Sequence, residues 1–440
     1  MTPNRDNPEK VLNHQKVLSY RWLIFAVLTT AYFLVYFHRL ALSVVANDLV
    51  REFQLSAGMM GLLGSVYFYC YAAMQLPAGL LADSLGPRKT VSGFLLIAAI
   101  GSLLFGLAQN FTMAFIGRLL VGFGVSMVFI PTMKILSQWF RVHEFAIMAG
   151  ILNAVGGIGV MAATWLLALM TSKFGWRLSF DAIGAATFIL LIMVWIIVRD
   201  KPADKGWPSL NRIDGINEAS QSQTEKITLG QGVLRVITEK RFWPVAIWFF
   251  LDCGIFFGFG ALWGGPYLMH LYNMSRAQAG SILSMIAWGM IIGSPLLGYL
   301  SEKVLRSRKK VFIGCTSLLT VVLFVFAGFS GNLPLAALYL LFFLFSFSAS
   351  AIVVIGFTTT KELFPVEIAG TSVGTVNLFP FLGGAVFMPL MGKILDLYPK
   401  NAAGAYAPEA YSRLLLILSG AALLALICTF FMQETFKRNR

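Results

Sequence analysis

The first long apolar segment of the chain contains a stripe of polar and aromatic side chains. Residues spaced three or four apart fall on one face of a helix, and this stripe comprises Tyr32, Tyr36, Arg39 and Ser43. The guanidinium of Arg39 is a planar fork that can bind a carboxylate or a phosphate through two hydrogen bonds. The spacing therefore predicts an anion-binding surface around Arg39. The alternative is a structural arginine that is satisfied by helix ends or by reaching solvent.

Three further ionisable groups interrupt apolar segments: His38, Arg118 and Asp252. A lone carboxyl in apolar surroundings can take up and release a proton when its environment changes. Asp252 is therefore the predicted proton carrier, with a structural ion pair as the alternative. His38 lies about 100° round the helix from Arg39 and could titrate near neutral pH, although a packed neutral imidazole is the simpler interpretation. Arg118 is suited to a buried hydrogen-bond hub that joins neighbouring helices.

Membrane-spanning helices are the elements that must position these groups. Of the 440 residues, 58% are hydrophobic and only 12% are charged, whereas about a quarter of the residues in a soluble domain are charged. Such a chain cannot cover a water-facing surface, so we expect an all-α polytopic membrane protein surrounded by the lipid bilayer. The net charge of +14 comes mainly from short loops between apolar segments, which favours membrane topology over nucleic-acid binding as its cause.

Twelve apolar segments approach the length of about 20 residues that a helix needs to cross a bilayer. The predicted spans are 22–46, 57–82, 90–109, 112–136, 144–170, 178–198, 242–271, 277–300, 310–329, 333–359, 369–395 and 410–432. An even number of spans places both termini on one side of the membrane. Most of the lysines and arginines lie at the termini and in the loops on that side, so both termini are predicted to be cytoplasmic.

The long polar segment 199–241 divides the spans six and six. Its first part, rich in Ser, Gln and Asn, is typical of a linker, and its second part, ITLGQGVLRVITEKRF, could form an amphipathic surface helix. We therefore predict two pseudo-symmetric six-helix bundles. The predicted domains are a cytoplasmic N-terminal segment 1–21, an N-terminal bundle 22–198, a cytoplasmic linker 199–241, a C-terminal bundle 242–432 and a cytoplasmic tail 433–440.

The two halves of the chain are related in sequence. GLLADSLGPRK, residues 79–89, is echoed by GYLSEKVLRSRKK in the second half, with Glu302 in the place of Asp83. Asn153 and Asn377 are likewise related near the ends of the two halves. Internal repeats in a membrane protein indicate a transporter whose substrate site lies between the halves.

The duplication makes span 1, with Arg39, the symmetry mate of span 7, with Asp252. The two side chains are predicted to face each other across the site, where an anion that broke their salt bridge would couple its own binding to protonation of the carboxyl. Asn153 and Asn377 could offer amide donors to the same substrate or could bond across helices. Trp263, in a glycine-rich part of span 7, is a further candidate for the cavity wall.

The charged turn at 79–89 and its echo have a mechanical interpretation. Asp83, near a helix end, could pair with Arg88 or with a basic residue of a neighbouring span, and Glu302 holds the equivalent place in the second half. Such pairs would form a latch that holds the cytoplasmic side closed and releases on opening. The tendency of positive charges to collect in cytoplasmic loops is enough to explain Arg88, but it does not explain the acidic Asp83.

In these motifs the chain resembles the major facilitator superfamily, over essentially its whole length. GLLADSLGPRK is similar to the family's signature between spans 2 and 3, and GRLLVGFGVS, which contains Arg118, is similar to its span 4 signature. YFHRLALSV at 36–44 and FIPTMKILSQWF at 129–140 resemble the branch of anion:cation symporters and organophosphate antiporters. Ser84 and the segment RVHEFA depart from these patterns.

The resemblance implies the twelve-helix major facilitator fold. It implies that a tyrosine and Arg39 in span 1 contact an anionic substrate, and that Arg118 acts in proton coupling or in structure. The expected location is the inner, or plasma, membrane of a bacterium.

Together these features predict a secondary active transporter that moves a small organic anion by proton-coupled alternating access. Nothing in the sequence indicates an enzyme, since it has no phosphate-cradling loop and no cluster of side chains with metal or nucleophile spacing. We expect no cofactor, a proton gradient as the driving force, no nucleic-acid partner and a monomer. The alternatives are an anion exchanger of the organophosphate/phosphate type and a transporter-like sensor that binds a ligand without transporting it.

Overall fold

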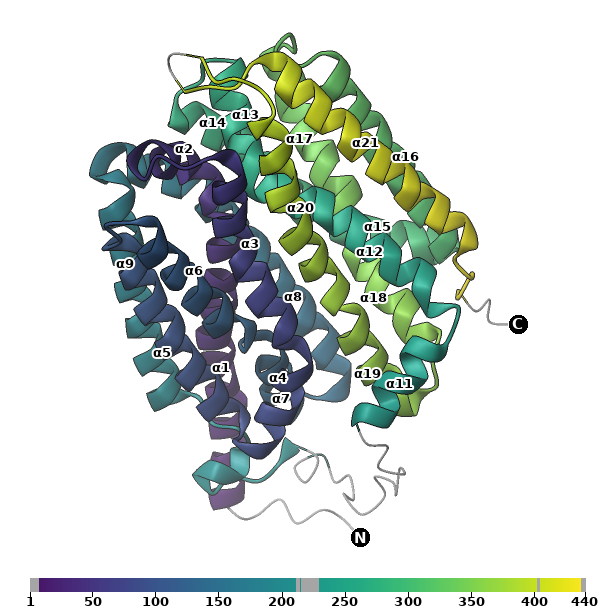
Figure 1. Ribbon diagram of the computed structural model, residues 1–440. Coiled ribbons are helices and arrows are strands. Elements are labelled where there is room, and N and C mark those ends of the chain that lie inside the picture. Colours follow the sequence, from purple (N-terminus) through teal and green to yellow (C-terminus); the bar gives the residue numbers. More distant parts are fainter. Residues whose placement is uncertain (1–7, 211–213, 215–228, 402–403, 437–440) are drawn as a thin grey trace.

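The computed structural model describes residues 8–210, 214, 229–401 and 404–436. Over these residues the chain is almost entirely helical and forms no β-sheet. Figure 1 shows two helical bundles side by side, the first coloured purple to blue and the second teal to yellow. The predicted all-α fold is confirmed.

The helices of each half follow one another with short connections. Those of the first half are α1 (Pro8–Leu40), α2 (Leu42–Glu52), α3 (Ala57–Ala73), α4 (Gln75–Ser84), α5 (Pro87–Gly106), α6 (Phe111–Ser126), α7 (Phe129–Trp139), α8 (Val142–Met161), η1 (Ala162–Leu166), α9 (Leu167–Ile197) and η2 (Pro202–Lys205). Those of the second half are α11 (Leu229–Thr238), α12 (Phe242–Ile255), η4 (Phe256–Trp263), α13 (Gly264–Leu271), α14 (Arg276–Leu283), α15 (Met285–Tyr299), η5 (Leu300–Val304), α16 (Arg308–Gly328), α17 (Leu335–Ala349), α18 (Val353–Glu362), α19 (Val366–Val376), α20 (Leu378–Asp396) and α21 (Pro408–Phe431).

The number of membrane crossings follows from the lengths of these helices. Ten continuous helical stretches in the described residues are long and apolar enough to cross a bilayer, and α3 with α4 form an eleventh that bends by 49°. One of the ten, Ile147–Ile197, has 51 residues, far more than the roughly 30 Å of a bilayer core accommodates in one pass. Gly175 interrupts it with a φ of 75°, a left-handed conformation that glycine adopts without strain. This stretch therefore makes two passes, and the chain has the twelve predicted spans.

The first span is longer than predicted. The helix begins at Pro8, whereas the sequence suggested a start near residue 22. The polar residues at this end continue the helix because they have partners in the bundle. Arg21 forms a salt bridge of 2.8 Å with Glu144, and the Tyr20 hydroxyl donates to the Ile197 carbonyl at 2.6 Å.

The predicted linker is described only in part. Residues 211–213 and 215–228 lie outside the described residues, but the predicted amphipathic helix is present as α11. It lies against α19 at the lower edge of the second bundle (Figure 1). Arg141 reaches Asp214 of the linker with a salt bridge of 2.7 Å, which ties this segment to the first bundle.

The helix connections gather on two faces of the molecule. The face at the bottom of Figure 1, here called the linker face, carries the connections at 85–86, 140–141, 198–210, 305–307 and 363–365. The other, here called the opposite face, carries the connections at 53–56, 107–110, 272–275, 329–334 and 397–401.

The C-terminal segment after α21 returns to cap another helix of the second bundle. Glu434 accepts hydrogen bonds from the backbone N–H groups of Arg308 at 3.0 Å and Lys309 at 3.4 Å, at the start of α16, and from the Ser307 hydroxyl. Burial of the Glu434 carboxyl opposes its ionisation, but these hydrogen bonds outweigh burial and lower its pKa below the ordinary value. A carboxylate at a helix N-terminus also interacts favourably with the helix dipole.

We predict that Glu434→Gln lowers the free energy of unfolding at pH 7 by about 1 kcal/mol, the usual effect of losing a helix cap. The pKa of Glu434 is lower in the folded state, so its stabilisation is present above the unfolded pKa of about 4.3 and is lost as the pH falls through the folded value. Thermal unfolding in detergent should therefore show a deficit at pH 7 that shrinks below pH ~4. Glu409→Gln, at an exposed glutamate in the first turn of α21, is the control for the helix dipole alone. A deficit no larger than that of this control, or one independent of pH, would contradict the capping role.

Candidate functional site

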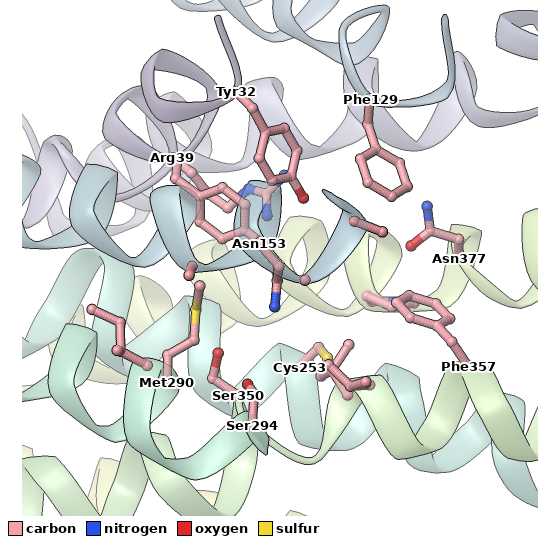
Figure 2. Close-up of a pocket in the computed structure, with 18 of the residues that line it drawn as sticks. Tyr32, Arg39, Phe129, Asn153, Cys253, Met290, Ser294, Ser350, Phe357 and Asn377 are labelled. Atoms are coloured by element: carbon pink, nitrogen blue, oxygen red, sulfur yellow. The ribbon is translucent and has the colours of Figure 1, made fainter. Parts of the chain in front are cut away.

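A cavity of about 770 Å³ lies between the two bundles. Its walls come from α1, α3, α7 and α8 of the first half and from α12, η4, α15, α17, α18 and α20 of the second (Figure 2). This volume is within the range of small-molecule sites, roughly 300 to 1,000 Å³. Thr358, Met133 and Ile147 line it near helix ends of the linker face, so the cavity extends toward that face.

Arg39 lies in the cavity wall and is surrounded by aromatic rings. The centre of its guanidinium is 4.4 Å from the ring of Tyr36, 5.1 Å from Tyr71, 5.1 Å from Phe381 and 5.7 Å from Phe257. Cation–π contacts of this kind contribute roughly 0.5 to 2 kcal/mol each. The rings come from both halves of the chain, so the arginine sits where the two bundles meet.

The charge of Arg39 has no counter-charge in the described part of the chain. No carboxylate there lies within 4.0 Å of its nitrogens, and its Nε atom has no hydrogen-bond partner. An ionised group inside a membrane costs several kcal/mol unless a partner or water compensates it. An anion that entered the cavity could therefore supply the missing counter-charge.

The other residues predicted to bind substrate have different surroundings. Tyr32 and Tyr36 line the cavity and pack edge to face, with ring centres 5.2 Å apart. Asn153 and Asn377 also line it, and Figure 2 shows both amides directed into the space between the bundles. The Asn377 amide donates to Gln75 Oε1 at 2.6 Å, a hydrogen bond between the two halves.

Four aromatic rings form a cage around Arg39, and three of them, Tyr71, Phe257 and Phe381, were not predicted from the sequence. Tyr71 lies midway between Tyr67 and Gln75 on one helical face of span 2, a spacing that could have identified it. No such spacing identifies Phe257 and Phe381. The chain has 38 phenylalanines, and those that face lipid lie in equally apolar stretches of sequence.

Asp252 does not face Arg39 in this conformation, contrary to expectation. Its carboxyl is fully buried, is not part of the cavity wall, and has no hydrogen-bond partner on either oxygen in the described residues. Trp248, four residues earlier on the same side of α12, donates to the Thr316 hydroxyl of α16 at 3.0 Å. Asp252 therefore points into the second bundle, while its neighbour Cys253 lines the cavity.

Arg118 and His38 also lie outside the cavity wall. Arg118 donates to the backbone carbonyl of His38 at 3.1 Å, and its guanidinium is 5.0 Å from the ring of Tyr67. Tyr67 in turn donates to the carbonyl of Val35 at 3.3 Å. The His38 ring is buried, and neither of its nitrogens has a partner in the described residues. These contacts fix the end of α1, next to Arg39, against spans 2 and 4.

Trp263 was expected in the cavity wall but lies elsewhere. It is buried within the second bundle and donates from Nε1 to the Met388 carbonyl at 3.2 Å. The glycine-rich run around it forms the π-helical turn η4 and the start of α13. A Cβ atom at Gly265 would stand only 1.9 Å from the Ser43 carbonyl oxygen. The glycines therefore allow close contact between the halves.

The charged residues of the predicted latch form bonds within their own bundles. Asp83 pairs with Lys134 of α7 at 2.5 Å, a basic residue of a neighbouring span. Arg88 instead donates to the Trp195 carbonyl at 2.6 Å, and Glu302 pairs with Arg308 at 3.3 Å. No ion pair joins the two bundles at the linker face in the described part of the chain.

Polar bonds between the halves are concentrated near the opposite face. Asp48 and Arg276 form a salt bridge of 2.5 Å. Asp396 accepts the backbone N–H groups of Ala57 at 2.8 Å and Gly58 at 2.7 Å, which caps the N-terminus of α3. The bundles are therefore joined on the opposite face, beyond the cavity.

Comparison with known proteins identifies relatives along the whole chain. The family model of the Major Facilitator Superfamily matches residues 28–265 and 246–440. The transporter YybO of Bacillus subtilis is 26% identical over 392 residues, which cover 86% of this chain and 88% of that protein. The probable galactarate/D-glucarate transporter GarP of Escherichia coli is 24% identical over 452 residues, covering 95% and 96%. The hexuronate transporter of Escherichia coli is 25% identical over 401 residues, covering 87% and 89%.

Solved structures share the fold. A bacterial homologue of the human lysosomal transporter Spinster, in an inward-facing and unoccupied conformation, has a TM-score of 0.76 at 17% identity and covers 96% of this chain and 99% of that one. The nucleoside transporter NupG has a TM-score of 0.72 at 15% identity, covering 92% and 98%. The resemblance to the superfamily drawn from the sequence motifs is thereby confirmed.

We predict that Trp263→Phe lowers the melting temperature without weakening ligand binding. The change removes the buried hydrogen bond to the Met388 carbonyl, worth about 0.5 to 1.5 kcal/mol, together with part of the packing of the indole, but it does not alter the cavity wall. Thermal unfolding and ligand titration of the purified variant would measure the two effects. A tenfold loss of affinity at an unchanged melting temperature would show that Trp263 belongs to the binding site after all.

Proposed function

The chain belongs to the Major Facilitator Superfamily, and we propose that it is a secondary transporter that carries a small organic anion by alternating access. The observation that carries this proposal is the uncompensated charge of Arg39 in a closed-ended cavity between the bundles. Since one chain forms the whole cavity, we propose that it acts as a monomer.

An anion is the ligand that this arrangement favours energetically. A carboxylate, sulfonate or phosphate group would neutralise Arg39 where water is scarce and electrostatic interactions are strong. The guanidinium could donate two hydrogen bonds to it, and the hydroxyls of Tyr32 and Tyr36 and the Asn153 amide are further donors in the wall. The names of relatives that transport galactarate and D-glucarate, hexuronate or sulfoacetate are consistent with an anionic substrate.

The conformation fits one half of a transport cycle. We take the linker face to be cytoplasmic, because the lysines and arginines outside the spans are concentrated on it, and we place the protein in the plasma membrane of a bacterium. The cavity then extends toward the cytoplasm, and the bonds of Asp48 and Asp396 close the outer side. The outward-facing state would require these bonds to break while the linker face closes. Asp83, Arg88 and Glu302 remain our candidates for contacts that form there.

We predict that Arg39→Gln and Arg39→Lys abolish uptake of the anion. Glutamine removes the charge, and lysine keeps the charge but lacks the planar fork. Losing a charge-assisted hydrogen bond costs about 3 kcal/mol, or roughly 100-fold in affinity. The measurement is uptake of labelled carboxylates, sulfonates and phosphate esters into proteoliposomes.

Lys173→Gln, which removes an exposed positive charge near the opposite face, is the control and should leave uptake unchanged. A monodisperse profile and a near-wild-type melting temperature would establish that the Arg39 variants fold. Uptake that persisted in either folded Arg39 variant would exclude Arg39 as the anion site.

Proton coupling is the finer part of the proposal, and Asp252 is its candidate. A buried carboxyl without partners is costly to ionise, so its ionisation should follow a change of surroundings such as alternating access produces. We predict that Asp252→Asn still exchanges labelled for unlabelled anion but no longer accumulates it when a pH gradient is applied. Accumulation that remains driven by the pH gradient would remove Asp252 as the proton carrier.

The same proteoliposomes separate the alternative functions. Uptake that requires anion inside the vesicles, and whose rate is the same with and without a pH gradient, would identify an exchanger. Saturable binding with no uptake under any condition would identify a ligand sensor and would overturn the transport proposal.

A further inference from the structure

The composition of the cavity wall narrows the class of substrate. Building on the proposed function, we propose that this protein carries an amphipathic monoanion: one carboxylate or sulfonate attached to an aromatic or bulky apolar body. Polyhydroxylated sugar acids and dianions, which the names of several relatives suggest, do not fit this wall.

The charge of the wall matches a single anionic group. Arg39 is the one ionised side chain among the residues that line the cavity in the described part of the chain. Lys134, next in sequence to the lining residue Met133, does not line the cavity and is paired with Asp83. A dianion would therefore bring a second charge into the cavity without a partner, at a cost of several kcal/mol.

The polar groups of the wall are a minority, since nine of its 28 residues carry a polar or charged side chain. Some are already used: the Thr358 hydroxyl donates to the Val354 carbonyl at 2.9 Å, and the Asn377 amide donates to Gln75. A hydroxyl that loses its water without gaining a partner costs about 1 to 3 kcal/mol. A hexuronate or galactarate carries hydroxyls along its whole carbon chain, so those that face the apolar part of the wall would be left unpaired.

The apolar part of the wall is extensive and aromatic. The residues that supply it include Phe129, Phe256, Phe357, Met133, Met290 and Ile151. In Figure 2, Arg39 lies on one side of the cavity, and Phe129 of the first bundle and Phe357 of the second lie on the other. A substrate with its anion at Arg39 would thus place its body between these rings, where offset or edge-to-face ring contacts contribute about 0.5 to 1.5 kcal/mol each beyond burial.

The test compares ligands that differ in one property at a time. The purified full-length protein in detergent is titrated by calorimetry with 2-phenylethanesulfonate and 3-phenylpropionate, with glucuronate and galactarate, and with the uncharged 3-phenylpropionamide. We expect the two aromatic anions to bind at least tenfold more tightly than either sugar acid, and the amide to bind at least tenfold more weakly than its acid. The sulfonate stays charged, so its uptake into proteoliposomes is free of passive leakage.

Variants of the wall locate the binding. Phe129→Ala should weaken binding of 2-phenylethanesulfonate at least fivefold, since its ring would lose a contact surface. Phe324→Ala, at a phenylalanine on the outer surface of α16, is the matched control and should leave affinity unchanged. Phe357→Leu keeps the wall apolar where Phe357 stacks on Phe249, and should weaken the aromatic anion at least threefold while the melting temperature stays near wild type.

The outcomes distinguish this inference from the proposed function. Arg39-dependent binding of glucuronate or galactarate that is as tight as that of the aromatic anions would overturn the substrate class and leave the anion transporter standing. Equal binding of the uncharged amide, or no binding of any anion in either group, would overturn the proposed anion function itself. Unchanged affinity in both Phe129→Ala and Phe357→Leu would also overturn the proposed binding mode.

Discussion

The cost of an unneutralised charge in an apolar interior is the constraint on which the site depends. Arg39 stands at the meeting of the two bundles with aromatic rings around it and no carboxylate beside it. The rings lower the energetic cost of burying its charge, and the guanidinium can still donate hydrogen bonds to an anion. Arg118 and Tyr67 hold the backbone next to it, so its position is fixed by hydrogen bonds to α1. The proposed anion site and the packing of α1 against spans 2 and 4 thus share the last turn of one helix.

The two sides of the bundle interface are built differently. On the opposite face the backbones touch: a Cβ atom at Gly61 would lie 2.5 Å from the Met388 carbonyl, and one at Gly392 would lie 2.2 Å from the Ala57 carbonyl. Around the cavity, by contrast, side chains from the two halves meet across open space. Tight backbone packing cannot deform gradually. Alternation between two states is therefore expected to be a rigid rocking of one bundle on the other, as internal duplication favours.

Much of the fold was predictable, and part of the site was. Twelve spans, two halves and the stripe of Tyr32, Tyr36 and Arg39 follow from apolar length and helical spacing, which are local properties of sequence. The orientation of Asp252 was not predictable, because symmetry between spans 1 and 7 fixes the place of a helix but not its rotation, and Asp252 faces its own bundle. Trp263 was misplaced for the same reason. Phenylalanines that form the cage differ from lipid-facing ones only in tertiary contacts.

The bonds that close the opposite face are charged and lie near its rim. Asp48 and Arg276 keep about a quarter of their side-chain surface exposed, so dissolved ions can reach them. The Debye length is about 8 Å at physiological ionic strength, so salt weakens this close, partly exposed pair only in part, and it affects the apolar contacts around the cavity even less. In the proposed orientation the opposite face meets the medium outside the cell, so the ionic strength of that medium would act on these bonds and, through them, on the balance between the two proposed conformations.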